Sequence, residues 1–179
     1  DVPPVAEEGL TAILLPLKDG KKELIARQLA KIEPETILFL DKLKRLAVGG
    51  GRSISRDDRQ GSIVSLHSNG LESLYFVHSK PCDRTERATD ERRPDINPRK
   101  VTIAFPLKNA AARNGRVFAF LPTEFDTGLP FLVNADFILN SNREQVLEDR
   151  RWNQWLRDEI APAFVKGFLL LLNEPEWKA

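Results

Sequence analysis

Apolar residues recur at helical spacing in the first part of the chain. From residue 19 they stand at Ile25, Leu29 and Ile32, which predicts an amphipathic helix. The pattern stops before Pro34, and proline favours the first turn of a new helix. We therefore expect a helix pair, and the apolar positions of the second helix are Ile37, Leu40, Leu43 and Ala47.

Short apolar runs predict strands at four further places. Residues 9–18 are mostly apolar and contain Pro16 near their end, as expected of a buried or edge strand. Apolar side chains also mark residues 101–107, 116–121 and 131–139, where apolar and polar positions tend to alternate. This alternation is typical of a sheet with one face on the core.

A hairpin is predicted in the middle of the chain. Residues 63–68 and 71–79 flank Asn69-Gly70, a dipeptide that adopts the positive φ angles of a two-residue turn. Such a turn pairs Ser68 with Leu71. The buried face of the hairpin would then carry Val64, Leu66, Ser73 and Tyr75.

Two stretches predict irregular structure. Gly49-Gly50-Gly51 and the charged run to Arg59 are typical of a connector. Between Lys80 and Lys100, twelve of 21 residues are charged and three are proline, which favours a mobile surface loop.

After Asn140 the periodicity becomes helical and continues to about Asn173. Pro162 interrupts it, and we expect a kink or a break there. The apolar stripe of this helical region is Trp152, Leu156, Ile160, Ala163 and Phe168. Strands and helices together predict an α+β fold, a mixed or antiparallel sheet packed with helices.

Composition limits the classes of function. The 179 residues are 41% hydrophobic and 30% charged with a net charge of +1, so a globular domain is expected and no general field attracts nucleic acid or a membrane. Cys82 is the single cysteine, and no apolar run reaches membrane-spanning length, which predicts an intracellular protein, cytoplasmic or nuclear. The chain begins at Asp1 and contains no methionine, and we expect it to be a piece of a longer protein.

Common catalytic and metal-binding patterns are missing. The chain has no phosphate-binding loop of the Gly-Lys-Ser type, no Gly-x-Ser-x-Gly elbow and no Cys/His spacing of a zinc site. In the predicted hairpin His67 and His78 are too far apart along the strands to share a metal, so none is expected. A basic cluster, diluted by aspartates and without interleaved aromatic residues, makes nucleic acid an unexpected partner; its members are Lys42, Lys44, Arg45, Arg52, Arg56 and Arg59.

The segment from Asn140 to Glu144 carries the most distinctive chemistry. Ser141 and Glu144 have the spacing of a capping box, which predicts that a helix begins here with Arg143 in its first turn. An arginine at the positive end of a helix is unfavourable unless an anion is bound nearby. The guanidinium would then suit a phosphate oxygen or a carboxylate. The alternative is an exposed turn in which Arg143 pairs with a neighbouring acidic side chain: Glu144, Glu148 or Asp149.

The residues from Phe118 to Glu144, continuing into Trp152-Asn-Gln-Trp-Leu156, resemble the segment that follows the ATPase domain in the sacsin family, which includes proteins of the NO VEIN type. This family of chaperone-like ATPases is placed in the gyrase, heat-shock chaperone, histidine kinase and MutL superfamily. More remotely, the chain resembles the middle domain of the ninety-kilodalton heat-shock chaperone. There a Leu-Asn-x-Ser-Arg-Glu element carries an arginine that contacts the γ-phosphate of ATP.

This resemblance implies that Arg143 is the γ-phosphate arginine, with Asn140 and Asn142 as further nucleotide contacts. Asn142 stands where the chaperone has serine, and Leu147 where it has glutamine. The element otherwise matches at Leu139, Asn140, Arg143 and Glu144.

The resemblance also implies how the chain is organised. Residues 1–18 would be the closing strand of an upstream ATPase domain, 19–48 a helical connector, and 49–179 a middle-domain-like unit. ATP and Mg would be held mainly by that upstream domain, the chief partner. Residues 121–130 offer an apolar edge for client proteins, or a loop that covers the core. The alternative function is an interaction scaffold that never touches nucleotide.

Overall fold

The computed structural model describes residues 16–48, 51–83, 88–94, 99–110 and 115–174. The chain divides after Ile32 into two compact units. In the first unit, helix α1 (Lys22–Ala30) confirms the predicted helix, and none of its side chains is buried. The predicted strand at 9–18 lies mostly outside the described residues, and its last three residues have no regular structure.

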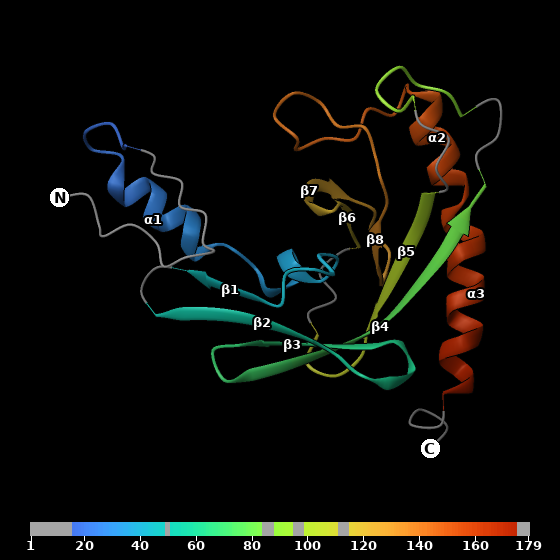
Figure 1. Ribbon diagram of the computed structural model, residues 1–179, viewed down its shortest axis with the longest axis horizontal. Coiled ribbons are helices and arrows are strands. Elements are labelled where there is room, and N and C mark those ends of the chain that lie inside the picture. The colour runs from blue at the N-terminus through green and yellow to red at the C-terminus, as the bar shows by residue number, and fades with distance from the viewer. Residues whose placement is uncertain (1–15, 49–50, 84–87, 95–98, 111–114, 175–179) are drawn as a thin grey trace. The chain divides into compact units, whose positions relative to one another are not determined.

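The second unit is built on one sheet that is mostly antiparallel (Figure 1). In the described part of the chain eight strands follow the order β1-β2-β3-β4-β5-β8-β6-β7, and β6 runs parallel to β8. Their bounds are β1 (Arg45–Val48), β2 (Arg52–Asp58), β3 (Ile63–Ser68), β4 (Leu71–Cys82), β5 (Arg99–Pro106), β6 (Arg116–Ala119), β7 (Leu121–Asp126) and β8 (Leu132–Asn134).

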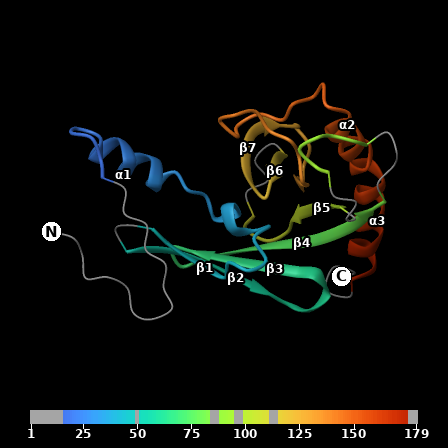
Figure 2. The ribbon, with the colours of Figure 1, turned by 45° about the horizontal axis from the view of Figure 1, so that its top comes forward.

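Both faces of this sheet are covered. Helices α2 (Arg151–Asp158) and α3 (Ile160–Asn173) belong to one side, where α3 runs along β4 and β5 (Figures 1 and 2). On the other side the 3₁₀ turn Pro34–Ile37 lies against β2 and β3, and the Tyr75 hydroxyl donates to Glu35 (2.6 Å). The predicted α+β class, with a sheet packed by helices, is confirmed.

The central hairpin is also confirmed. Ser68 pairs with Leu71, and Asn69 and Gly70 both have positive φ (53° and 74°). Val64 and Tyr75 are buried as predicted. The opposite face of the hairpin is buried as well, at Ile63, Ser65 and Phe76, because α3 and its neighbours cover that side.

The second helix of the predicted pair is wrong. Only the short 3₁₀ turn follows Pro34, and residues 45–48 form strand β1. The predicted connector after the glycines is strand β2, which pairs with both β1 and β3. The apolar spacing fitted a helix, but Ile37, Leu38 and Phe39 are all buried in succession beneath the sheet. A helix of this length would expose part of such a run, so non-local packing outweighs the local preference.

The C-terminal helical region divides near Pro162, as predicted. Glu159 ends α2 and precedes α3, so Pro162 lies in the first turn of α3, where a missing N–H removes no helical bond. Trp152, Leu156 and Ala163 from the predicted stripe are fully buried. The expected long strand at 131–139 is much shorter, because only residues 132–134 pair in β8.

Candidate functional site

The segment around Arg143 is a tight hairpin turn, and the predicted helix start there is wrong. The helix begins at Arg151, so Ser141 and Glu144 cap no helix. Instead residues 138–140 run beside 145–147: the Asn140 N–H donates to the Gln145 carbonyl (3.0 Å), and Leu147 donates to Ile138 (3.1 Å).

Asparagine side chains shape this turn. Asn140 Oδ1 accepts the backbone N–H groups of Glu144 and Gln145, each at 3.2 Å. Asn142 Oδ1 accepts the Glu144 N–H at 3.3 Å, and its amide donates to the Glu144 carboxylate. These bonds satisfy the N–H groups of Glu144 and Gln145 without a helix. The prediction of a helix start from the capping-box spacing is therefore wrong, because asparagine side chains bond the segment into a turn instead.

Arg143 is exposed at the tip of the turn and adopts a left-handed backbone conformation, with φ at 62°. For a residue with a Cβ this conformation costs about 1 kcal/mol or more. Its guanidinium makes no hydrogen bond or ion pair with any described residue, although Glu144, Glu148 and Asp149 are near in sequence. The alternative in which Arg143 is paired with one of these carboxylates is not seen.

Arg143 and Asn140 line one cavity of about 230 Å³. Phe120 lines it too and is likewise left-handed (φ 67°), with its N–H bonded to Asn134 Oδ1 at 2.8 Å. Strained backbone is often retained where it positions functional groups. The side chain of Asn142 does not line this cavity, so the structure brings together only two of the three predicted nucleotide-contacting residues.

Positive charge predominates in this arginine cavity, because its lining contains three arginines and one aspartate, Asp136. Arg93 donates two hydrogen bonds of 2.7 Å to the Asp136 carboxylate, and Arg99 of strand β5 donates a third of 3.0 Å. The negative charge of Asp136 is thus already matched, and the remaining positive charge faces the cavity. An anion is the complementary ligand.

Arg92 is a charged residue of the cavity lining that the sequence did not identify, as it did not identify Arg93 or Asp136. It lies in the charged stretch that was predicted to be a mobile loop, but the ends of that stretch belong to β4 and β5, and Arg93 in its described middle part bonds to Asp136. Ala88 is fully buried, and the Asp90 side chain accepts the Arg92 N–H (2.9 Å). The Asp-x-Arg pattern that begins this Asx turn was the available signal.

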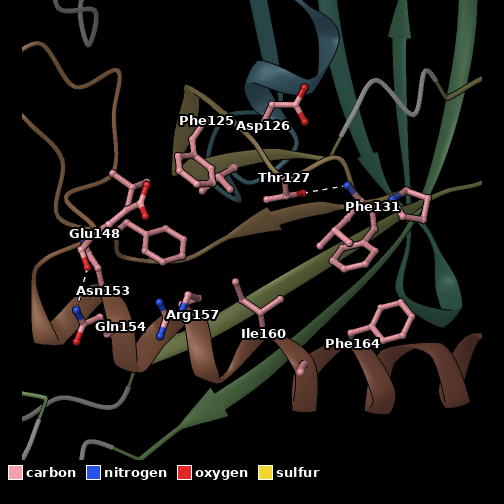
Figure 3. A pocket seen from close by; sticks show the side chains of 16 residues that line it. Phe125, Asp126, Thr127, Phe131, Glu148, Asn153, Gln154, Arg157, Ile160 and Phe164 are labelled. Carbon is pink, nitrogen blue, oxygen red and sulfur yellow. Dashed lines mark hydrogen bonds between the residues drawn. The ribbon is translucent and has the colours of Figure 1, made fainter.

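A second, larger cavity lies between the β7–β8 connection and the helices. This apolar groove measures about 730 Å³, and its lining includes Phe125, Phe131, Phe137, Val146, Ile160 and Phe164. Figure 3 shows Phe125 and Phe131 on one side of it, with Ile160 and Phe164 from α3 on the other. Phe125 to Pro130 belong to the predicted client-binding edge, so that edge is one wall of the groove.

Close backbone contacts fix the outer wall of the apolar groove. The Thr127 hydroxyl and N–H both donate to the Gly115 carbonyl (2.7 and 3.2 Å). A Cβ at Gly115 would clash with Thr127 and Leu129, and its φ is +55°. The ring of Phe131 stacks on the ring of Phe164, with 4.9 Å between the ring centroids.

The two histidines have different surroundings. His67 contacts Ser65 Oγ (3.1 Å) and Asp57 (3.3 Å). His78 packs against Gly167 of α3, where burial and then the nearby Lys166 lower its pKa. Within the described ranges, no three His, Cys, Asp or Glu side chains are grouped so that they could hold a metal.

Acidic neighbours occupy part of the basic cluster. Lys44 pairs with Asp58, and the buried Arg56 contacts Asp41 (3.2 Å) and Asp58 (2.7 Å). These contacts reduce the charge that a nucleic acid would meet. None of the helices in the described residues is long and apolar enough to cross a membrane.

Comparison with known proteins adds two relatives. The chain is 30% identical to Protein NO VEIN of Arabidopsis thaliana over 184 aligned residues, 93% of this chain but 6% of that protein. It is 41% identical to sacsin of Homo sapiens over 64 residues, 31% of this chain and 1% of sacsin. The chain thus resembles a segment of these large proteins. No family model matches it, and no solved structure does.

Proposed function

We propose that this chain is the middle segment of a sacsin-like, ATP-dependent protein and supplies Arg143 to the γ-phosphate of ATP bound by an upstream domain. In this proposal the fold is related to the middle domain of the ninety-kilodalton heat-shock chaperone. The guanidinium of Arg143, which pairs with no described residue and belongs to the lining of a positively charged cavity, is the observation that carries it.

The residues present fit a phosphate group. A guanidinium offers planar N–H donors that match phosphate oxygens, and the Asn140 side chain beside it is already oriented by the N–H groups of Glu144 and Gln145. ATP would bring the phosphoryl group and its Mg, both held mainly by the upstream domain. Arg143 would offset negative charge on that group, as arginine fingers do.

The test uses the parent protein with its upstream ATPase domain. Arg143→Ala is expected to lower ATP turnover by roughly 10³-fold or more, the range known for arginine fingers, with little change in nucleotide affinity. Arg151→Ala is the matched control, because Arg151 is an exposed arginine that does not line the arginine cavity. Unchanged turnover in Arg143→Ala would instead support the scaffold alternative.

We also propose that the apolar groove binds client polypeptide, as the predicted edge suggested. Its volume lies in the range of ligand pockets. The Glu148 carboxylate and Asp126 lie among its lining, whereas Arg157 is paired with Asp158 (3.1 Å). The polypeptide that fits this groove is therefore an apolar segment with an adjacent basic residue.

Peptide binding can be measured by fluorescence anisotropy. A labelled Leu/Phe-rich peptide flanked by lysine should bind the chain, and Ile160→Asp should weaken it at least about tenfold, because a charge would enter the apolar lining. Leu169→Asp is the control at an exposed position of α3 outside the groove. Equal binding of lysine-flanked and glutamate-flanked peptides would contradict the charge argument, and equal loss in both variants would contradict the groove.

A further inference from the structure

The arginine cavity contains a second guanidinium that the resemblance does not assign. Arg92 lines the same cavity as Arg143 and Asn140. Its guanidinium makes one long hydrogen bond, to the backbone carbonyl of Leu139 (3.4 Å), and no carboxylate among the described residues pairs with it.

Arg92 is held in place through its neighbours. The Asp90 side chain accepts the Arg92 N–H at 2.9 Å, and Arg93 donates to the Arg92 carbonyl (2.9 Å) while it grips Asp136. Asp90 also faces Arg150 at 3.5 Å, just before helix α2. The backbone of residue 92 is therefore fixed from both sides, and its side chain is left to face the cavity.

A fixed backbone matters for anion binding. An arginine on a mobile loop must be ordered when it binds, and the lost freedom reduces affinity. Here the ordering is already provided by the Arg93–Asp136 contact, whose partners are only 28% and 17% exposed. The Leu139 carbonyl that Arg92 contacts directly precedes Asn140, so both arginines border the same turn.

We infer that Arg92 and Arg143 together form a two-arginine site for a terminal phosphate, with Arg92 as a binding residue recruited from the charged 80–100 stretch. This inference rests on the proposed function and extends it. Two guanidiniums on one phosphate give bonds from two directions, which fixes its orientation as well as its charge. Arg93 does not take this role, because Asp136 already occupies its N–H donors.

The experiment titrates the 179-residue chain with inorganic tripolyphosphate and follows backbone amides of residues 138–147 by ¹H–¹⁵N NMR. Saturable shifts are expected in the wild type. Arg92→Ala and Arg143→Ala should each weaken binding about tenfold or more, since a hydrogen bond to a charged group is worth about that factor. Arg92→Lys, which keeps the charge and loses the fork, should fall between. Arg151→Ala should stay within about twofold.

The outcomes separate the two proposals. A loss in Arg143→Ala with Arg92→Ala unchanged overturns the inference about Arg92 and leaves the proposed role of Arg143 standing. A loss in Arg92→Ala alone overturns the role of Arg143 and the shared site. Shifts that do not saturate, or that are spread evenly over basic surfaces, overturn the two-arginine site, whereas the turnover of Arg143→Ala in the parent protein still decides the proposed role of Arg143. Because the only described partner of the Arg92 guanidinium is the Leu139 carbonyl, the alanine variant should keep the wild-type spectrum away from the cavity.

Discussion

Asn153 connects the arginine turn to helix α2, and its removal is the sharpest test of how that turn is held. The residue is 3% exposed. Its Oδ1 accepts the Ile138 N–H, and its Nδ2 donates to the carbonyls of Ile138 and Leu147, all at 2.8 Å. One side chain thus holds both arms of the hairpin that presents Arg143.

The cost of Asn153→Ala follows from these bonds. The Ile138 carbonyl still accepts the Leu147 N–H, and the Leu147 carbonyl still accepts from Arg150 (3.3 Å). The Ile138 N–H is left buried without an acceptor, at a cost of about 1–3 kcal/mol, and each lost bond to a satisfied carbonyl adds about 0.5–1.5 kcal/mol. We expect a loss of about 3 kcal/mol in the free energy of unfolding.

Urea denaturation followed by circular dichroism and tryptophan fluorescence measures this loss by linear extrapolation. Ser141→Ala is the control, since Ser141 is exposed in the same turn and its hydroxyl bonds to no described residue, so a change of less than about 0.5 kcal/mol is expected. Asn153→Asp keeps an acceptor but places a carboxylate against two carbonyls, so it should be at least as destabilising at neutral pH. A loss below about 1 kcal/mol in Asn153→Ala would refute the assignment of these bonds.

Two further predictions concern ionisable groups. Asp136→Ala leaves two partly buried arginines without their shared carboxylate and should lower the free energy of unfolding by about 2–3 kcal/mol in urea denaturation. Asp158→Ala is the control, because it breaks an exposed ion pair (66% and 70% exposed) and should cost less than about 1 kcal/mol. Equal losses in the two variants would contradict this prediction. Burial lowers the pKa of His78 in the folded state, so the unfolded state binds more protons below about pH 6.5. The free energy of unfolding should therefore fall as the pH drops through that value, and it should fall less in His78→Gln. Parallel pH profiles of the two proteins would contradict this prediction.

The hairpin and the break between the last two helices were predicted correctly, because residues close together in the sequence determine them. Asn69-Gly70 has the backbone freedom that a two-residue turn requires, so the hairpin and its register followed from the dipeptide. Pro162 located the break between the last two helices for a similar reason. In both cases the deciding interactions lie within a few residues of the signal.

The errors arose where distant partners decide. Residues 45–48 are a strand because β2 pairs with them, although their apolar spacing also fits a helix. At 140–144 the amide of Asn140 bonds to Glu144 and Gln145, and the bridge between Leu139 and Val146 closes the turn. A capping-box spacing cannot distinguish these two outcomes.

Only part of the candidate site was predicted, because one of its residues comes from a distant part of the sequence. Arg143 and Asn140 belong to one turn and were found together from a motif. Arg92 reaches that turn from 47 residues earlier, through its contact with the Leu139 carbonyl. The Asp-x-Arg pattern at Asp90 indicates the local Asx turn, but not this approach, which depends on the burial of Ala88 and on the pairing of Arg93 with Asp136.

Residues 136–140 form one wall of the arginine cavity, and this wall meets the apolar groove at Phe137. Phe137 lines the arginine cavity and the apolar groove, and Asn153, which lines the groove, holds Ile138. Closely packed interiors transmit small displacements, so a variant that moves this wall should alter both cavities. Asn153→Ala is therefore expected to weaken tripolyphosphate binding without touching either arginine, and a phosphate affinity that survives a large loss of stability would show that the turn holds Arg143 without α2.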